Sequence, residues 1–167
     1  MDHVAIDGRE YEFEDAGQVW LASWVPPGGS VPEGTRHGSG AVCRISDERI
    51  VLISQDGLTW DHPAGRPENH ENWRGTLDRE VLEEACAVVE SAELLGFVKG
   101  RCVQGKEASL VLVRALWSAN VRLQEWQPKH EIKHRKLVDN NQVPEFLSHP
   151  SGLDPIFNRW LAESLKT

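Results

Sequence analysis

Long hydrophobic runs are absent from this chain of 167 residues. A helix that crosses a bilayer needs about 20 consecutive apolar residues, and the sequence has no such stretch. Residues 1–7 contain neither a basic segment nor an apolar segment, so they do not predict secretion. We therefore expect a cytoplasmic protein that has no membrane partner.

Cysteine is scarce in this sequence. The three cysteines, Cys43, Cys86 and Cys102, form an odd set without CxxC spacing. This pattern argues against a disulfide framework and against a zinc site. The fold must then depend on an ordinary hydrophobic core.

Positive charge is also in short supply, with 18 Lys and Arg against 26 Asp and Glu and a formal net charge of −8. This charge would repel the backbone of a nucleic acid, and no dense Lys/Arg run offsets it locally. We expect no nucleic-acid polymer as a partner. A small polyphosphate stays compatible with the composition, because divalent cations can reverse the local field around carboxylates.

The apolar content is ordinary for a globular protein, with 40% hydrophobic and 26% charged residues. A chain of this length can bury one substantial core, so we expect a single compact domain. Apolar patterns and turn residues predict this order of elements: one or two strands in 11–25, a Pro/Gly-rich loop in 26–40, a hairpin of 41–46 and 49–54, a helix in 72–89, strands in 92–103 and 108–117, a loop in 125–136, a helical turn in 143–147 and a helix that opens at 154.

The predicted helix 72–89 carries an unusual acidic side. Glu80, Glu83 and Glu84 stand at positions i, i+3 and i+4, so they face one way beside the apolar stripe. Like charges at these spacings cost a helix about 0.2–0.5 kcal/mol per pair, and Arg79 can neutralise only part of the cluster, through Glu83. A bound cation would reduce the repulsion between these carboxylates.

Two interpretations of the glutamates stay open from their spacing alone. The cluster is either a solvated face of an amphipathic helix or a cation site. Its surroundings favour a cation, because Ala64-Gly65 lets backbone come close to a ligand and Glu71 is placed to pair with Arg79. Hard oxygen ligands of this kind suit Mg²⁺, with Mn²⁺ as the other candidate.

The segment 65–87, GRPENHENWRGTLDREVLEEACA, resembles the Nudix box. The pattern of that box is G-x5-E-x7-R-E-U-x-E-E-x-G-U, where U is aliphatic, and this segment matches it at six polar or glycine positions. Cys86 departs from the pattern, which has glycine there. Ala64 stands where many members have the first glycine of a Gly-Gly pair, although the Ala-Gly version is familiar among the ADP-sugar hydrolases of the family.

The resemblance implies an α/β fold class, namely a Nudix-like α/β/α sandwich with a mixed central sheet. The predicted strands and helices follow the family's order from about residue 40 onward. We therefore expect an N-terminal extension in residues 1–39 and a Nudix-like hydrolase domain in residues 40–167. Trp20 and Trp24 of the extension could cover a homodimer interface.

The function that the resemblance implies is that of a Mg²⁺-dependent pyrophosphohydrolase. Its substrate would be a small nucleotide, a nucleoside diphosphate linked to another group, such as a nucleoside triphosphate or a nucleotide sugar. The alternative is a non-catalytic Nudix-like module that binds a nucleotide or acts in regulation.

Residue roles follow from the family pattern, position by position. The carboxylates would bind metal or orient water, the backbone carbonyl at the Ala-Gly step would join them as a ligand, and the remaining fixed positions would be structural. The expected metal ligands are Ala64, Glu80, Glu83 and Glu84, and the structural partners are Gly65, Glu71 and Arg79. A further catalytic glutamate is expected from the loop 125–136, with Glu131 as the first candidate and Glu125 as its rival. The other interpretation of either residue is a solvated loop charge.

Overall fold

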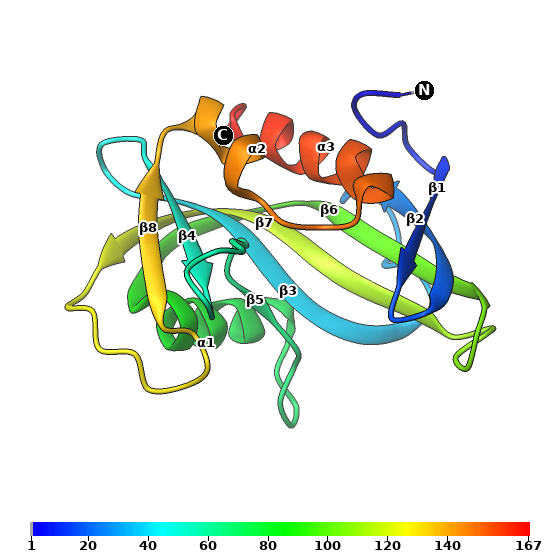
Figure 1. The fold of residues 1–167 in the computed structure, drawn as a ribbon, viewed down its shortest axis with the longest axis horizontal. Coiled ribbons are helices and arrows are strands. Elements are labelled where there is room, and N and C mark those ends of the chain that lie inside the picture. Colours follow the sequence, from blue (N-terminus) through cyan, green and yellow to red (C-terminus); the bar gives the residue numbers. More distant parts are fainter. Residues whose placement is uncertain (1) are drawn as a thin grey trace. The chain divides into compact units, whose positions relative to one another are not determined.

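The computed structural model of the protein describes residues 2–167 (Figure 1). Its strands are hydrogen-bonded in the order β1-β2-β6-β7-β3-β4-β8, with β5 paired to β3. The strands are β1 (Glu10–Asp15), β2 (Gln18–Val25), β3 (Thr35–Arg44), β4 (Ile50–Ser54), β5 (Ala64–Gly65), β6 (Ala87–Gln104), β7 (Val111–Leu123) and β8 (His134–Val138), and the helices are α1 (Trp73–Ala85), α2 (Val143–Phe146) and α3 (Asp154–Ser164).

The chain divides into two compact units. Unit 1 comprises Met1–His37, Leu94–Leu116 and His149–Thr167, and unit 2 comprises Gly38–Glu93 and Trp117–Ser148. Strands β3, β6 and β7 each contribute residues to both units.

The sheet is mixed. β1 with β2, β2 with β6, and β4 with β8 are antiparallel pairs. β3 and β7 run in the same direction, since Gly34 lies beside Val111 just where these strands begin and Ser39 hydrogen-bonds Trp117 further along them. The mixed sheet and the α/β class confirm the predicted fold class.

Unit 2 is organised around α1, which lies beside β5 and β4 (Figure 1). The helix turns Leu77, Val81 and Ala85 inward, and each of these side chains is fully buried. They join a hydrophobic core whose other buried members are Ala41, Cys43, Val51, Ile53, Ala87, Ala119, Val121 and Ile132. Burying the apolar stripe of α1 fixes which side of the helix carries the glutamates.

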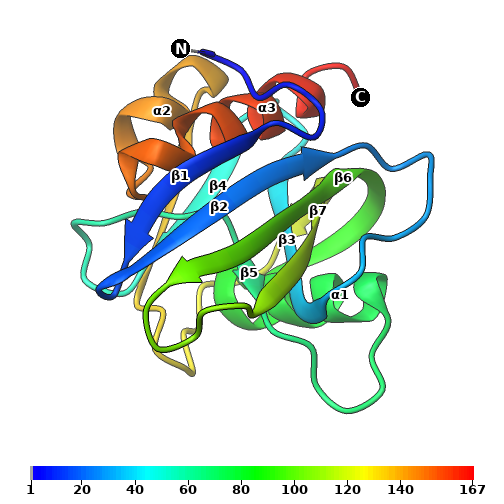
Figure 2. The same cartoon turned by 90° about the vertical axis from the view of Figure 1, so that its right-hand side faces the viewer.

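Unit 1 contains the β1–β2 hairpin and α3 (Figure 2). β2 is paired with β6 from Val19 opposite Gln104 to Val25 opposite Phe97. The side chains of Trp20 and Trp24 are 7% and 0% exposed, so they pack inside unit 1 and offer little surface for a homodimer.

Several predicted elements are confirmed. α1 begins where expected, and the side chain of Asn72 caps it by accepting a hydrogen bond of 2.7 Å from the Gly75 N–H. The hairpin of 41–46 and 49–54, the turn at 143–147 and the helix that opens at 154 are also present, as β3 with β4, α2 and α3. Within residues 2–167, no helix has both the length and the apolar character that a bilayer crossing requires.

Other predicted boundaries are wrong. β3 begins at Thr35, inside the predicted loop 26–40, and β8 begins at His134, inside the predicted loop 125–136. The predicted strands 92–103 and 108–117 are longer or shifted, as β6 and β7. The predicted helix 72–89 ends at Ala85, because Cys86 takes a left-handed conformation with φ 49°. For the strands, pairing with distant strands overrides the local composition.

Candidate metal and catalytic site

The acidic side of α1 faces β5, a strand of two residues that pairs with β3. The approach is so close that a Cβ on Gly65 would overlap the carboxylate of Glu80. A Cβ on Gly38, which has φ +132°, would in turn overlap the carbonyl oxygen of Gly65. Both glycines are therefore required by the close approach of backbone to the glutamate.

Arg79 and Glu71 form a two-pronged ion pair that joins the loop to α1. The Nε and Nη2 atoms of Arg79 donate to the two carboxylate oxygens of Glu71 at 2.7 and 3.0 Å. Glu71 also accepts from the backbone N–H of Glu68 and the hydroxyl of Thr76. These donors, Arg79 first, lower the pKa of Glu71 from 4.5 to about 2.

The same guanidinium reaches the glutamates of α1. Arg79 Nη1 donates to Glu80 at 2.7 Å and to Glu83 at 3.2 Å, and Nη2 donates to the carbonyl oxygen of Arg66 at 2.7 Å. Glu71 and then Glu80 raise the pKa of Arg79 above its usual range. Arg79 thus holds the loop before α1 and offsets part of the negative charge on that helix.

Glu84 is the most enclosed carboxylate of the cluster. Its Oε1 accepts a hydrogen bond of 2.9 Å from the backbone N–H of Ala64. The pKa of Glu84 is raised to about 8, mainly by burial. The negative charges of Glu80, Glu131 and Asp61 contribute to this rise, and the hydrogen bond from Ala64 opposes it. Burial is also the main cause that raises the pKa of Glu80, although Arg79 opposes it.

The acidic side of α1 offers oxygen ligands for a metal ion. Across residues 2–167, no three or more His, Cys, Asp or Glu side chains converge closely enough to hold one, and at α1 two of the carboxylates are hydrogen-bonded to Arg79. The donor set nevertheless fits a hard divalent cation, because its ligands would be oxygens and Glu84 lies in an excess of negative charge. A cation would relieve the cost of burying that carboxylate.

The two candidates in the loop before β8 lie near different members of the cluster. The charge of Glu131 raises the pKa of both Glu80 and Glu84, so its carboxylate lies within electrostatic reach of both. Glu125 instead lines a cavity of about 350 Å³ together with Glu83.

Two residues lie near the cluster although the sequence did not predict them there. Asp61 lies just upstream of the motif, and its charge raises the pKa of Glu84. Cys43 is fully buried on β3, where burial and the charge of Glu84 raise the pKa of its thiol to about 12. The acidic side chain of Asp61 shortly before Ala64 was a signal in the sequence, whereas nothing in the sequence brings Cys43 next to Glu84.

A known protein family matches the part of the chain that contains this site. Residues 34–160 match the family model described as the NUDIX domain. A search of curated protein sequences finds no match.

Solved structures resemble this fold over most of the chain. Bacillus subtilis pyrophosphohydrolase BsRppH, determined as a mutant, has a TM-score of 0.67 and 23% identity, with 93% of this chain and 96% of that chain covered. The NUDIX domain of Shewanella oneidensis NrtR, in complex with ADP ribose, has a TM-score of 0.58 and 19% identity, with 81% and 90% covered. The MutT protein of Bacillus halodurans has a TM-score of 0.58 and 19% identity, with 75% and 81% covered.

At these identities the solved structures show the shared fold, and the family model covers most of the chain, including the whole segment 65–87. The resemblance drawn from that segment is confirmed. The chain belongs to the Nudix hydrolase family.

Proposed function

We propose that the protein is a Mg²⁺-dependent pyrophosphohydrolase that cleaves a nucleoside diphosphate linked to another group, either a nucleoside triphosphate or a nucleotide sugar. The observation that carries the proposal is the placement of Glu84. This carboxylate is enclosed between α1 and the backbone of Ala64, and the charges of Glu80, Glu131 and Asp61 surround it. Nudix hydrolases generally use divalent metal cations.

The ligands of the cation would be the carboxylates of Glu80, Glu83 and Glu84 with the backbone carbonyl of Ala64. Mn²⁺ suits the same oxygen donors as Mg²⁺. When bound, the cation would supply positive charge that neutralises the phosphate oxygens of the substrate. Glu80 and Glu83 would exchange their hydrogen bonds with Arg79 for this role, while Glu71 keeps the guanidinium in place.

A general base is also needed to take the proton of the attacking water. Glu131 is our first candidate, because it lies on a loop and within electrostatic reach of Glu80 and Glu84. Glu125 is the rival, since it shares a cavity with Glu83. Replacing each by Gln in turn separates them, because only loss of the base lowers kcat while the binding of substrate persists.

The hydrolase proposal is tested with purified protein, Mg²⁺ and a panel of nucleoside triphosphates, nucleotide sugars and dinucleotides. We expect at least one substrate to be cleaved, and Glu84→Gln to lower kcat/KM by about 100-fold or more. Glu93→Gln, the same substitution at an exposed position on β6, is the matched control and should leave the rate unchanged. If no substrate yields product above the Glu84→Gln background with either Mg²⁺ or Mn²⁺, the hydrolase proposal fails for that panel.

A second candidate function is a non-catalytic module that binds a nucleotide. It is favoured by the hydrogen bonds that hold Glu80 and Glu83 on Arg79, and the NUDIX domain of NrtR was solved with ADP ribose. Calorimetry separates the candidates, since a module would bind nucleotide with Mg²⁺ while product stays at background. No binding of Mg²⁺ or Mn²⁺, with or without nucleotide, would instead indicate that the acidic side of α1 is a solvated face.

The remaining expectations about the molecule's surroundings stay predictions. They are a cytoplasmic location, the lack of a nucleic-acid polymer partner and a homodimer. The homodimer would have to use a surface other than the buried Trp20 and Trp24.

A further inference from the structure

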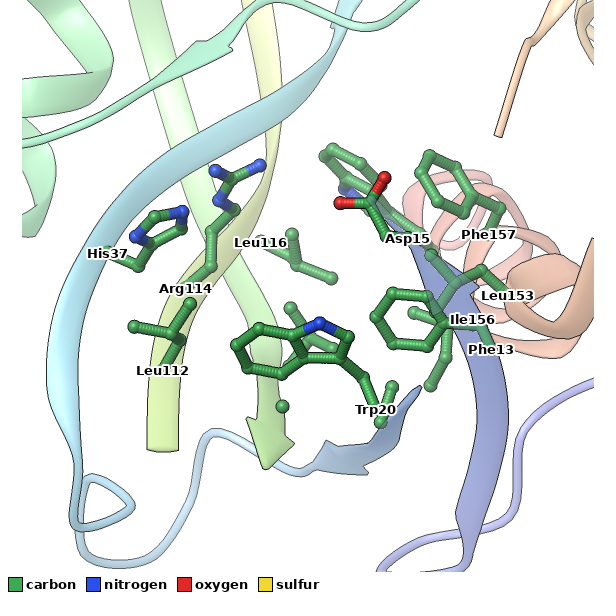
Figure 3. A pocket seen from close by; sticks show the side chains of 14 residues that line it. Phe13, Asp15, Trp20, His37, Leu112, Arg114, Leu116, Leu153, Ile156 and Phe157 are labelled. Atoms are coloured by element: carbon green, nitrogen blue, oxygen red, sulfur yellow. The ribbon is translucent and has the colours of Figure 1, made fainter. Parts of the chain in front are cut away.

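Unit 1 contains a cavity of its own, about 280 Å³ in volume (Figure 3). Its wall comes from β1, β2, β3, β6, β7 and the start of α3, and most of the lining side chains are apolar. Ligand pockets commonly measure about 300–1,000 Å³. This cavity lies just below that range, so it has room for one ring system with its substituents extending into solvent.

One side of the cavity is aromatic. The rings of Phe13 and Trp20 are nearly parallel, with an interplanar angle of 16° and centroids 6.5 Å apart, and Phe157 of α3 adds a further ring. Figure 3 shows Phe13, Trp20 and Phe157 among the side chains that line the cavity. Such a wall favours a planar ring that stacks on it.

The polar groups of the cavity have opposite charges on its two sides. Figure 3 shows the carboxylate of Asp15 on the side of Phe13 and Phe157, and the side chains of Arg114 and His37 on the side of β7 and β3. A ligand that fills the space would therefore meet a hydrogen-bond acceptor at one edge and donors at the opposite edge.

We propose that this cavity binds a guanine base. The N1–H and 2-amino groups of guanine are adjacent donors that suit the carboxylate of Asp15, and its O6 and N7 atoms are adjacent acceptors that suit Arg114. The ring itself would stack on Trp20. Adenine fits less well, because its N1 is an acceptor and would face the carboxylate of Asp15.

The binding test uses calorimetry with guanosine 5′-monophosphate and adenosine 5′-monophosphate in buffer that contains EDTA, so that no divalent cation takes part. We expect the guanine nucleotide to bind about ten-fold more tightly than the adenine nucleotide. Asp15→Asn should abolish that preference, and Arg114→Gln should weaken the binding of the guanine nucleotide. Glu14→Gln is the matched control, because Glu14 is the exposed neighbour of Asp15 and does not line the cavity.

The proposal is overturned if neither nucleotide binds at millimolar concentration, if the two bind equally, or if Asp15→Asn leaves the preference intact. The melting temperature of each variant checks whether the variant keeps the fold. Because Asp15 is exposed at the end of β1, we expect Asp15→Asn to have the melting temperature of the wild type.

The guanine ring could belong to the hydrolysed nucleotide or to a separate effector. The first case rests on the proposed function, and Asp15→Asn would then raise KM for guanine nucleotides with little change in kcat. In the second case, guanosine 5′-monophosphate would change the rate with a substrate that lacks guanine. Binding in EDTA requires no hydrolysis. If the protein proves not to be a hydrolase, the guanine site can therefore still be confirmed, and the two results are distinguishable.

Discussion

Arg79 carries the positive charge that meets the acidic side of α1. It donates to Glu71, Glu80, Glu83 and the carbonyl of Arg66. The spacing of the residues predicts only the bonds to Glu71 and Glu83, since a neighbour in sequence such as Glu80 normally points to another side of a helix. The contact with Glu80 arises because β5 confines that carboxylate.

The ionised form of Glu71 should make stability depend on pH. The pKa of Glu71 is about 2 in the folded protein, against a usual value of 4.5. Its contribution to the free energy of unfolding is therefore fully present above pH 4.5 and is lost as the pH falls toward 2. We expect Glu71→Gln to be less stable than wild type at pH 6, with a difference that shrinks toward pH 2. Urea unfolding across this range checks the prediction, with Glu93→Gln as the control. A difference that stays constant with pH would contradict the pKa shift of Glu71.

Gly65 should not tolerate a methyl group. A Cβ at this position overlaps the carboxylate of Glu80, so either the glutamate or β5 must move. We expect Gly65→Ala to lower the free energy of unfolding by about 1–3 kcal/mol. Gly28→Ala is the control, because no atom lies within 4 Å of a Cβ built there. Equal stability of the two variants would show that Glu80 can turn away without cost.

At the scale of elements, the end of α1 explains the main departure from the family motif. Cys86 has φ 49°, and its N–H closes the helix on the carbonyl of Leu82. Glycine adopts this left-handed conformation without the strain of about 1–2 kcal/mol that a side chain causes. In this chain the position that holds glycine in the motif is the helix cap, and it is occupied by a cysteine.

Two substitutions separate the strain at this cap from the packing of the thiol. Cys86→Gly and Cys86→Ala both remove the thiol, but only glycine relieves the left-handed backbone. We therefore expect Cys86→Gly to exceed Cys86→Ala in free energy of unfolding by about 1 kcal/mol. Chemical denaturation measures the difference. A more stable alanine variant would mean that the helix ends differently in solution.

Elements whose signals are local were predictable from the sequence. α1 has its cap at Asn72 and its apolar stripe within a few turns, and the β3–β4 hairpin needs only a short connection. The pairing of β2 with β6 was not predictable, because 72 to 85 residues separate the partners, from Val25 opposite Phe97 to Val19 opposite Gln104, and many registers suit the same apolar pattern. For the same reason the cavity of unit 1 was invisible in the sequence, since its walls come from distant segments.

Part of the candidate site was likewise predictable from the sequence, and part was not. Glu80, Glu83 and Glu84 share one side of a helix, so their proximity follows from spacing alone. The enclosure of Glu84 by the backbone of Ala64 depends on where β5 pairs with β3, and no local pattern encodes that register.

At the scale of the whole molecule, β3, β6 and β7 run without a break through both units. Because continuous strands transmit the loss of structure, we expect the chain to unfold in one cooperative transition. Trp24 is fully buried in unit 1, so we expect Trp24→Ala to lower the free energy of unfolding by about 3–5 kcal/mol. Hydrogen exchange should then show an equal loss of protection for the amides of β4 in unit 2.

The control for this experiment is Val31→Ala, since Val31 is 50% exposed and its truncation should change stability by less than about 0.5 kcal/mol. Loss of protection confined to unit 1 in Trp24→Ala would show instead that the units unfold independently.

The close approach at Gly38, Gly65 and Glu80 also bears on how such a sequence can change over generations. A side chain at Gly38 would displace Gly65, and a side chain at Gly65 would displace Glu80. Three positions spread over more than forty residues are therefore linked by two close approaches, neither of which leaves room for a methyl group. Gly38 lies well before the motif, yet we expect saturation mutagenesis to find it as intolerant of replacement as the motif itself. A chain that retains the motif should therefore also retain this glycine.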